Sequence, residues 1–109
     1  MKQNGEIKLH VLLEQTGQQH DIQISAEASF DQLHQLIQEK FGWDNSHLYQ
    51  FIVDGQYFIS EDQEDSAEDE LFAKDQKLTD FLSSGQEFRY IYDLGDCWEH
   101  HITVEPINQ

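Results

Sequence analysis

Hydrophobic and polar positions alternate most regularly between residues 88 and 105, and the pattern is broken once, at Gly95-Asp96. A period of two is typical of β-strands that bury one face. It therefore predicts two long strands joined by a tight turn, with Phe88, Tyr90 and Tyr92 on one face of the first strand. The second strand presents four side chains on one face: Trp98, His100, Ile102 and Val104. We expect one of these aromatic sets to pack beneath a helix.

Two further pairs of strands are predicted earlier in the chain. Residues 6–13 alternate in the same way, and residues 20–26 return after a polar loop, which indicates an N-terminal hairpin. Residues 47–53 and 56–60 are rich in aromatic and β-branched side chains and flank Asp54-Gly55. Asp-Gly between such runs is a strong hairpin signal, so these two segments are predicted to pair.

One helix is predicted over residues 29–41. Its apolar stripe has helical spacing and consists of Phe30, Leu33, Leu36, Ile37 and Phe41. Ser29 and Gln32 have the spacing of a capping box, and Gly42 stands where a C-terminal cap is expected. Residues 77–82 predict a short helical turn before the final pair of strands.

The order of elements is ββαββ, a helical turn and ββ, within 109 residues. A chain of this length forms one domain, and a single helix with one apolar face must cover one sheet. The sequence therefore predicts one domain over 1–109 of the α+β class. We expect a two-layer sandwich, with a mainly antiparallel sheet, one long helix packed on one face and a ubiquitin-like ββα start.

Acidic residues change the picture of possible partners. The chain has 22 acidic and 6 basic residues, a formal charge of -16, and seven of the acids lie within residues 61–70. Like charges at this density predict an exposed, mobile loop at 61–70. The charge argues against direct nucleic-acid binding, which needs clustered Lys and Arg, and it favours a monomer with a basic protein partner.

The single cysteine, Cys97, excludes an internal disulfide and fits a reducing, cytoplasmic setting. No apolar run approaches the length that spans a bilayer, so no membrane association is expected. Acidic neighbours raise the pKa of a thiol, which argues against Cys97 as a nucleophile. The sequence therefore favours a non-enzymatic protein without a required cofactor.

A divalent metal is the one cofactor that the ligand types allow. His47, Asp93, Asp96 and His100 could form a metal site, because His and carboxylate side chains near one turn suit a zinc-like ion. In the alternative interpretation, Asp93 and Asp96 accept hydrogen bonds from backbone N–H groups of the turn, and His100 is a partly buried, hydrogen-bonded histidine.

A second set of candidates forms a binding surface for a protein partner. Its members are Trp43, Tyr90, Tyr92, Trp98 and Arg89, because aromatic and Arg side chains dominate binding energy at interfaces. The alternative is that the aromatic members belong only to the core.

Two segments carry a resemblance to a known family. The C-terminal YDLGDCWEHHITVE and the segment FGWDNSHLYQF after the predicted helix are similar to motifs of the plasmid pRiA-type ORF-three-like family, which is also labelled TnpR-like, a passenger protein of insertion elements. The resemblance implies an α+β domain in mobile-element or bacterial genomic contexts. Two departures are Leu94 in place of Phe and the absence of a basic segment, typical of the family, from residues 17–25.

The sequence thus favours a small acidic interaction or accessory domain. One alternative is a metal-binding or metal-dependent hydrolase-like protein. The other is an accessory factor in DNA transactions that acts through basic proteins. A recombinase is not supported, because the chain has only one Arg, Arg89, to hold a scissile phosphate.

Overall fold

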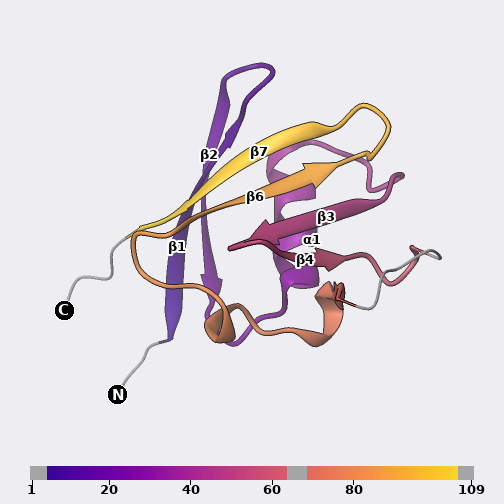
Figure 1. Ribbon diagram of the computed structural model, residues 1–109. Coiled ribbons are helices and arrows are strands. Elements are labelled where there is room, and N and C mark those ends of the chain that lie inside the picture. Colours follow the sequence, from indigo (N-terminus) through magenta and orange to yellow (C-terminus); the bar gives the residue numbers. More distant parts are fainter. Residues whose placement is uncertain (1–4, 64–68, 106–109) are drawn as a thin grey trace.

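The computed structural model describes residues 5–63 and 69–105, and its elements are labelled in Figure 1. The strands are β1 (Glu6–Leu13), β2 (Gln18–Ser25), β3 (Tyr49–Val53), β4 (Gln56–Ile59), β5 (Leu71–Phe72), β6 (Glu87–Tyr92) and β7 (Trp98–Val104). The α-helix is α1 (Phe30–Phe41), and two single turns of 3₁₀-helix are η1 (Ala73–Asp75) and η2 (Leu78–Asp80). Among these described elements, no helix is long and apolar enough to cross a membrane.

All seven strands belong to one sheet in the order β2-β1-β7-β6-β3-β4-β5. The predicted C-terminal ribbon is confirmed, because β6 and β7 pair antiparallel and place Tyr90 opposite His100. β7 also pairs with β1, so the C-terminal strand joins the N-terminal hairpin to the rest of the sheet. Its central place explains why its alternation is the most regular in the chain.

The predicted fold class is wrong. Strands account for 44% and helices for 19% of the described residues, so the molecule is mainly a seven-stranded sheet rather than a sheet with one long helix in a ubiquitin-like ββα layout. The sheet is mixed, because the short β5 pairs parallel to β4 while the other neighbours are antiparallel. It is also strongly twisted: in Figure 1 the β1–β2 hairpin runs nearly upright, whereas β3, β4 and β6 cross the view.

The helix itself begins and ends as the sequence predicts. The Ser29 hydroxyl accepts a hydrogen bond from the Gln32 backbone N–H at 3.1 Å, and the Gln32 side chain accepts one from the Ser29 N–H at 2.9 Å. Gly42 ends the helix with φ of 74°, a left-handed conformation that glycine adopts without a Cβ clash. Both ends therefore satisfy backbone groups that the helix leaves unpaired.

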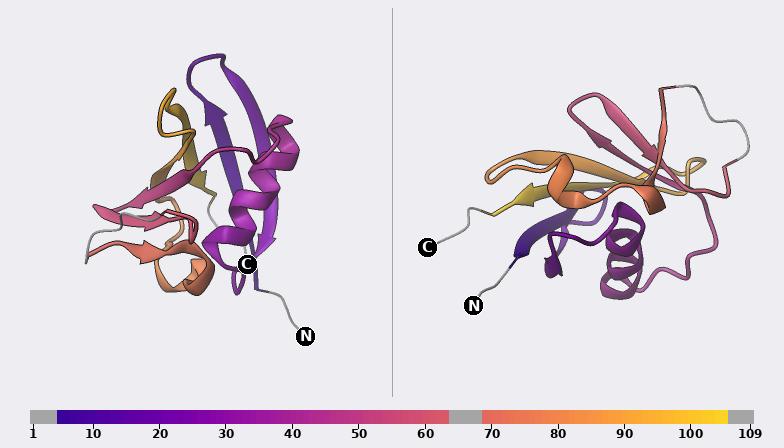
Figure 2. Two further views of the ribbon diagram at one scale, coloured as in Figure 1. Left: turned by 90° about the vertical axis from the view of Figure 1, so that its right-hand side faces the viewer. Right: turned by 90° about the horizontal axis from the view of Figure 1, so that it is seen from below.

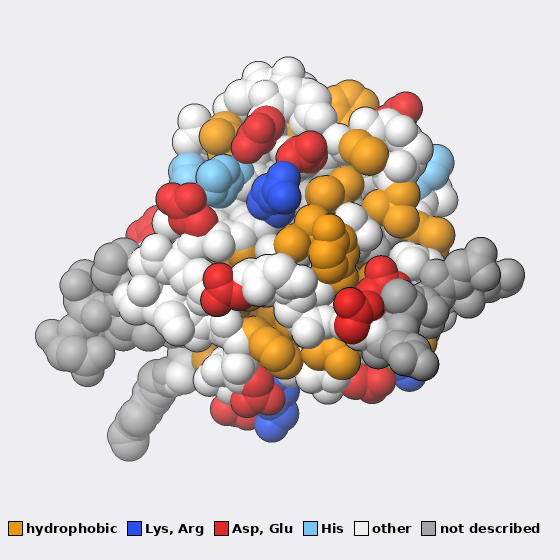
Figure 3. Space-filling view, viewed as in Figure 1, with side chains coloured by type: hydrophobic (Ala, Val, Ile, Leu, Met, Phe, Trp, Pro, Cys, Tyr) orange, Lys and Arg blue, Asp and Glu red, His pale blue; other side chains and the backbone are white. Residues whose placement is uncertain are grey.

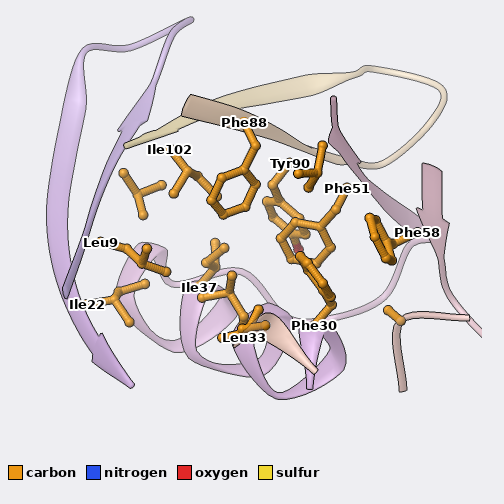
Figure 4. Packing of buried hydrophobic residues seen from close by; sticks show 14 of the residues in the cluster. Leu9, Ile22, Phe30, Leu33, Ile37, Phe51, Phe58, Phe88, Tyr90 and Ile102 are labelled. Atoms are coloured by element: carbon orange, nitrogen blue, oxygen red, sulfur yellow. The ribbon is translucent and has the colours of Figure 1, made fainter. Parts of the chain in front are cut away.

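The core lies between α1 and the sheet, and Figure 2 shows the helix against one side of the strands. Figure 4 shows Phe30, Leu33 and Ile37 pointing from the helix toward Phe88 and other residues of the strands. The expected aromatic set is confirmed, because Phe88, Tyr90 and Tyr92 are 3%, 0% and 2% exposed. These residues fix the helix relative to the loop that follows it, where the candidate site lies.

The acidic segment 61–70 is only partly described, because residues 64–68 lie outside the described residues. Its mobility therefore stays a prediction. Directly after it, Leu71–Phe72 forms β5.

Candidate functional site

A pocket of about 340 Å³ opens between the loop that follows α1 and the turn that joins β6 to β7. We call it the aromatic pocket. Its described lining consists of Gly42, Trp43, Asp44, Ser46, His47, Tyr92, Asp93, Asp96 and Trp98. The two contributing segments are about fifty residues apart in sequence, and the sheet brings them together.

Three aromatic rings form the walls of this pocket. The Trp43 ring centroid lies 5.2 Å from that of Tyr92 and 5.4 Å from that of Trp98, and both pairs are tilted by 42°. The His47 ring meets Tyr92 edge-on at 5.8 Å. Electron-rich ring faces of this kind attract cations.

Carboxylates stand beside the rings. Asp44 Oδ1 accepts a hydrogen bond from the Ser46 hydroxyl at 2.6 Å and a longer one from the Tyr92 hydroxyl at 3.4 Å. The hydrogen bond from the Ser46 hydroxyl, as the main cause, lowers the pKa of Asp44 below its usual range. Asp93 and Asp96 add two more carboxylates, and among the described lining residues none is Lys or Arg. The pocket is therefore aromatic in its walls and negative at its edge.

The backbone holds the two loops in this arrangement. The Asp93 N–H donates to the Leu48 carbonyl at 2.8 Å, and the Ser46 N–H donates to the Tyr92 hydroxyl at 2.9 Å, so the two loops are linked twice. Asp93 and Cys97 have φ of 65° and 56°. Left-handed backbone outside glycine is uncommon and is concentrated where a structure holds functional groups in place.

His100 lies behind the pocket. It is 0% exposed, and its Nε2 accepts a hydrogen bond from the Trp43 indole N–H at 3.3 Å. Its Nδ1–H donates to the carbonyls of Tyr90 and Trp98 at 3.2 and 3.0 Å. Burial, as the main cause, lowers the pKa of His100 to about 4. This neutral ring thus fixes the inner edge of Trp43.

A buried polar network supports the same loop from the other side. The Tyr90 hydroxyl contacts His34 Nδ1 at 2.6 Å and accepts from the Gln38 amide at 3.0 Å. His34 Nε2 contacts the Asn45 side-chain oxygen at 2.7 Å. Gln38 Oε1 accepts a hydrogen bond from the Asn45 backbone N–H, also at 2.7 Å. Burial lowers the pKa of His34 and raises that of Tyr90, so both stay neutral. The network therefore holds Asn45, between Asp44 and Ser46, in place.

We expect Tyr90→Phe to lower the free energy of unfolding by about 1.5 kcal/mol, because it removes the hydroxyl that His34 Nδ1 and the Gln38 amide N–H bond in the core. Chemical denaturation followed by circular dichroism measures this value. The control is Tyr57→Phe, whose side chain is 40% exposed and whose change should stay within about 0.5 kcal/mol. Equal effects of the two substitutions would contradict the role of the network.

Three of the four predicted metal ligands line one pocket, but their ligand atoms do not all lie within 4.8 Å of one another. His47, Asp93 and Asp96 line the aromatic pocket, with His47 Nε2 at 3.6 Å from Asp93 Oδ2. His100 is separated from them, since its Nε2 faces the Trp43 indole. Asp93 Oδ1 also accepts hydrogen bonds from the backbone N–H groups of Gly95 and Asp96, as the alternative interpretation proposed for this turn.

The predicted binding residues divide in the same way. Trp43 and Trp98 are half-buried and line the aromatic pocket together with Tyr92, which is only 2% exposed, whereas Tyr90 lies wholly inside the core. Arg89 points to the opposite face of the sheet and pairs with Glu99 at 3.4 Å. Arg89 is therefore not part of the pocket.

Figure 3 shows acidic side chains distributed over the face viewed in Figure 1, with hydrophobic side chains gathered toward the region of β3 and β4.

Two lining residues, Asp44 and Ser46, are not among the candidates that the sequence suggests. The available signal was their position directly after the helix cap and Trp43. Cys97 is exposed, and its thiol donates to the Leu94 carbonyl at 3.3 Å.

Comparisons with known proteins place the chain in a family. The sequence profile of the family described as "Plasmid pRiA4b ORF-3-like protein" matches residues 6–109, and the chain therefore belongs to this family. It is 36% identical over 75 residues to "Uncharacterized protein y4hQ" of Sinorhizobium fredii. That alignment covers 67% of this chain and 38% of the Sinorhizobium protein.

A solved structure has the same fold. It is the crystal structure of "Protein of Unknown Function MM3350" from Methanosarcina mazei Go1, with a TM-score of 0.80 and 25% sequence identity. The match covers 92% of this chain and 60% of that one. The chain thus spans less than two thirds of the length of either relative.

Proposed function

We propose that this protein is a binding domain that takes a cationic side chain of a basic protein partner into the aromatic pocket. The observation that carries the proposal is the pair of half-buried indole rings of Trp43 and Trp98, packed around the buried Tyr92 ring, with carboxylates at one opening. A cation over an aromatic face gains about 0.5–2 kcal/mol, most when it is desolvated. Carboxylates at the edge would pair with the same charge and with its neighbours.

The charge of the whole chain supports the same kind of partner. A formal charge of -16 draws cationic molecules toward the surface and repels phosphate backbones. The partner would therefore be a protein segment rich in Lys or Arg rather than a nucleic acid. An accessory role in DNA transactions through basic proteins, including those of mobile elements, is one setting for such binding, and the plasmid in the family's name supports it.

A divalent cation is the second candidate for this pocket. It is favoured by the approach of His47 to Asp93 at 3.6 Å and by Asp96 in the same lining. We further propose a cytoplasmic setting, which the exposed thiol of Cys97 supports, because free thiols persist in reducing compartments.

Binding of a short Lys- and Arg-rich peptide, measured by isothermal titration calorimetry with and without chelator, tests the proposal. Trp98→Leu keeps an apolar side chain and removes the ring face, and we expect it to weaken binding about tenfold. Asp96→Asn removes one exposed carboxylate at the pocket, and we expect about a threefold loss.

The matched control is Asp80→Asn, which removes the same charge from η2, away from the pocket. It keeps the net charge equal to that of Asp96→Asn, so any difference between the two variants reports the pocket itself. Equal binding by both Asp variants, together with unchanged binding by Trp98→Leu, would exclude the pocket. Binding of metal rather than peptide, lost in His47→Gln, would favour the second candidate.

A further inference from the structure

A second cluster of polar side chains lies on the outer face of the sheet, away from the aromatic pocket. Leu9 and Val11 point into the core and are fully buried, so His10 between them points to the side opposite α1. His10 is paired directly with Asp21 of β2 in the β1–β2 register. The cluster is therefore built on paired strands rather than on a loop.

Glu105 completes this cluster from the end of β7. Thr103 is the partner of His10 in the β1–β7 register, and Glu105 lies two residues further along on the same face. Its backbone N–H donates to the Lys8 carbonyl at 2.9 Å, which fixes its position beside β1. Among the described residues, His10, Asp21 and Glu105 form the one group of three His, Cys, Asp or Glu whose ligand atoms all lie within 4.8 Å of one another.

The hydrogen bonds of His10 show which nitrogen an ion would take. The Nε2–H donates to the Gln19 side-chain carbonyl at 2.8 Å, and the Nδ1–H of the protonated ring donates to Asp21 Oδ1 at 2.8 Å, so an ion must replace the Nδ1 proton. A metal-binding histidine usually donates its other ring N–H to a carbonyl or carboxylate, which fixes the tautomer. Gln19 has this role here, so the Nδ1 lone pair of a neutral His10 would point at the carboxylates.

We propose that His10, Asp21 and Glu105 form a binding site for a transition-metal dication of the zinc type. One imidazole and two carboxylates balance two positive charges and give three protein ligands, with water in the remaining positions. The imidazole favours zinc over calcium or magnesium, which prefer oxygen ligands alone. When His10 is protonated, the ion displaces the Nδ1 proton to solvent, so binding releases one proton and weakens as the pH falls.

Other charged groups on the same face act on His10 and Asp21. Asp21, as the main cause, raises the pKa of His10, and Glu105 acts in the same direction. The hydrogen bond to His10, as the main cause, lowers the pKa of Asp21, and the charge of Lys8 on the same face of β1 acts in the same direction.

Another histidine provides an internal control. His101, also on the outer face, has two carboxylates near its ring, Glu14 Oε2 at 3.4 Å from Nδ1 and Glu87 Oε1 at 2.9 Å from Nε2. These carboxylates lie at different nitrogens of the ring, so they do not converge on one position as Asp21 and Glu105 do. His10 and His101 thus have the same number of nearby carboxylates, but only those near His10 converge on one position.

Calorimetric titration of the whole chain with Zn²⁺ at pH 7.5 tests the proposal. We expect one ion per chain, at least a tenfold loss of affinity in His10→Gln and a loss of about 10- to 100-fold in Gln19→Ala. We expect wild-type affinity in His101→Gln and in His47→Gln, which tests the aromatic pocket separately. Proton release, obtained from buffers of different ionisation enthalpy, should accompany binding and increase as the pH is lowered from 7.5.

The proposal would be overturned by wild-type affinity in His10→Gln, by no zinc binding in the wild-type chain, or by an equal loss in His101→Gln. A loss confined to His47→Gln would assign the ion to the aromatic pocket and also overturn it. Because His10 is on the surface, circular dichroism of His10→Gln should match the wild type, and the ¹⁵N shift of His10 Nδ1 on adding zinc reports binding without any substitution. Failure here leaves the binding of basic peptides untouched.

Discussion

Replacing Phe30 with alanine is expected to lower the free energy of unfolding by about 3–5 kcal/mol. Phe30 is 0% exposed, stacks on Phe58 with ring centroids 4.2 Å apart and contacts Phe51 at 5.3 Å. Truncation would leave a cavity between the helix start and the centre of the sheet. Since domains of this size are stable by only about 5–15 kcal/mol, the loss is a large part of the total.

Chemical denaturation at pH 7.5 measures the loss, with Phe72→Ala as the control. Phe72 is a phenylalanine of the short strand β5 and is 38% exposed, so its truncation should cost less than about 1 kcal/mol. A Phe30→Ala protein that is as stable as Phe72→Ala would mean that α1 is not anchored to the sheet as described.

The wild-type protein is expected to lose about 2 kcal/mol of its free energy of unfolding between pH 7 and pH 5 through His100 alone. The pKa of His100 falls from 6.5 to about 4 in the folded state, mainly through burial. The unfolded chain therefore binds more protons than the folded one between these values. The stability linked to neutral His100 is fully present above about pH 6.5 and is lost as the pH falls toward 4.

The comparison that isolates this effect is His100→Gln, which keeps a side-chain oxygen as acceptor for the Trp43 indole. Between pH 7 and pH 5 the variant should lose about 2 kcal/mol less of its free energy of unfolding than the wild type loses. His101→Gln, on the opposite face, should keep the wild-type dependence. An unchanged pH dependence in His100→Gln would show that the ring is not held neutral in the core.

Local signals in the sequence were sufficient for the main elements. The Ser29 and Gln32 capping box, Gly42 and the stripe on Phe30 and Leu33 predicted α1, because caps and helical spacing depend only on near neighbours. Alternation likewise predicted the β6–β7 ribbon and its buried face. These features act over a few residues, so the chain itself contains them.

The fold class required information that no local pattern contains. Leu71–Phe72 is too short to show a period of two, so the parallel strand β5 and the mixed sheet could not be predicted. Pairing of β1 with β7 joins residues about ninety positions apart, and the twist across seven strands follows from all of the pairings together. The excess of strand over helix, which contradicts the predicted layout, depends on these long-range strand pairings.

The candidate site was predicted in part for the same reason. Trp43, Tyr92 and Trp98 were chosen by residue type, and the structure alone shows that they share one pocket while Tyr90 and Arg89 do not. The metal cluster of His10, Asp21 and Glu105 was not recognised, because its members come from β1, β2 and the residue after β7, and the sequence does not specify how these strands are aligned.

The most direct test of the aromatic pocket uses the indole N–H signals of Trp43 and Trp98 in a ¹⁵N correlation spectrum, because both tryptophans of the chain line it. Titration with a Lys- and Arg-rich peptide is expected to shift both indole signals along one saturating curve. A Glu-rich peptide of equal length should leave them in place. Unshifted indole signals during binding of the basic peptide, with shifts instead around Arg89 and His101, would contradict the account.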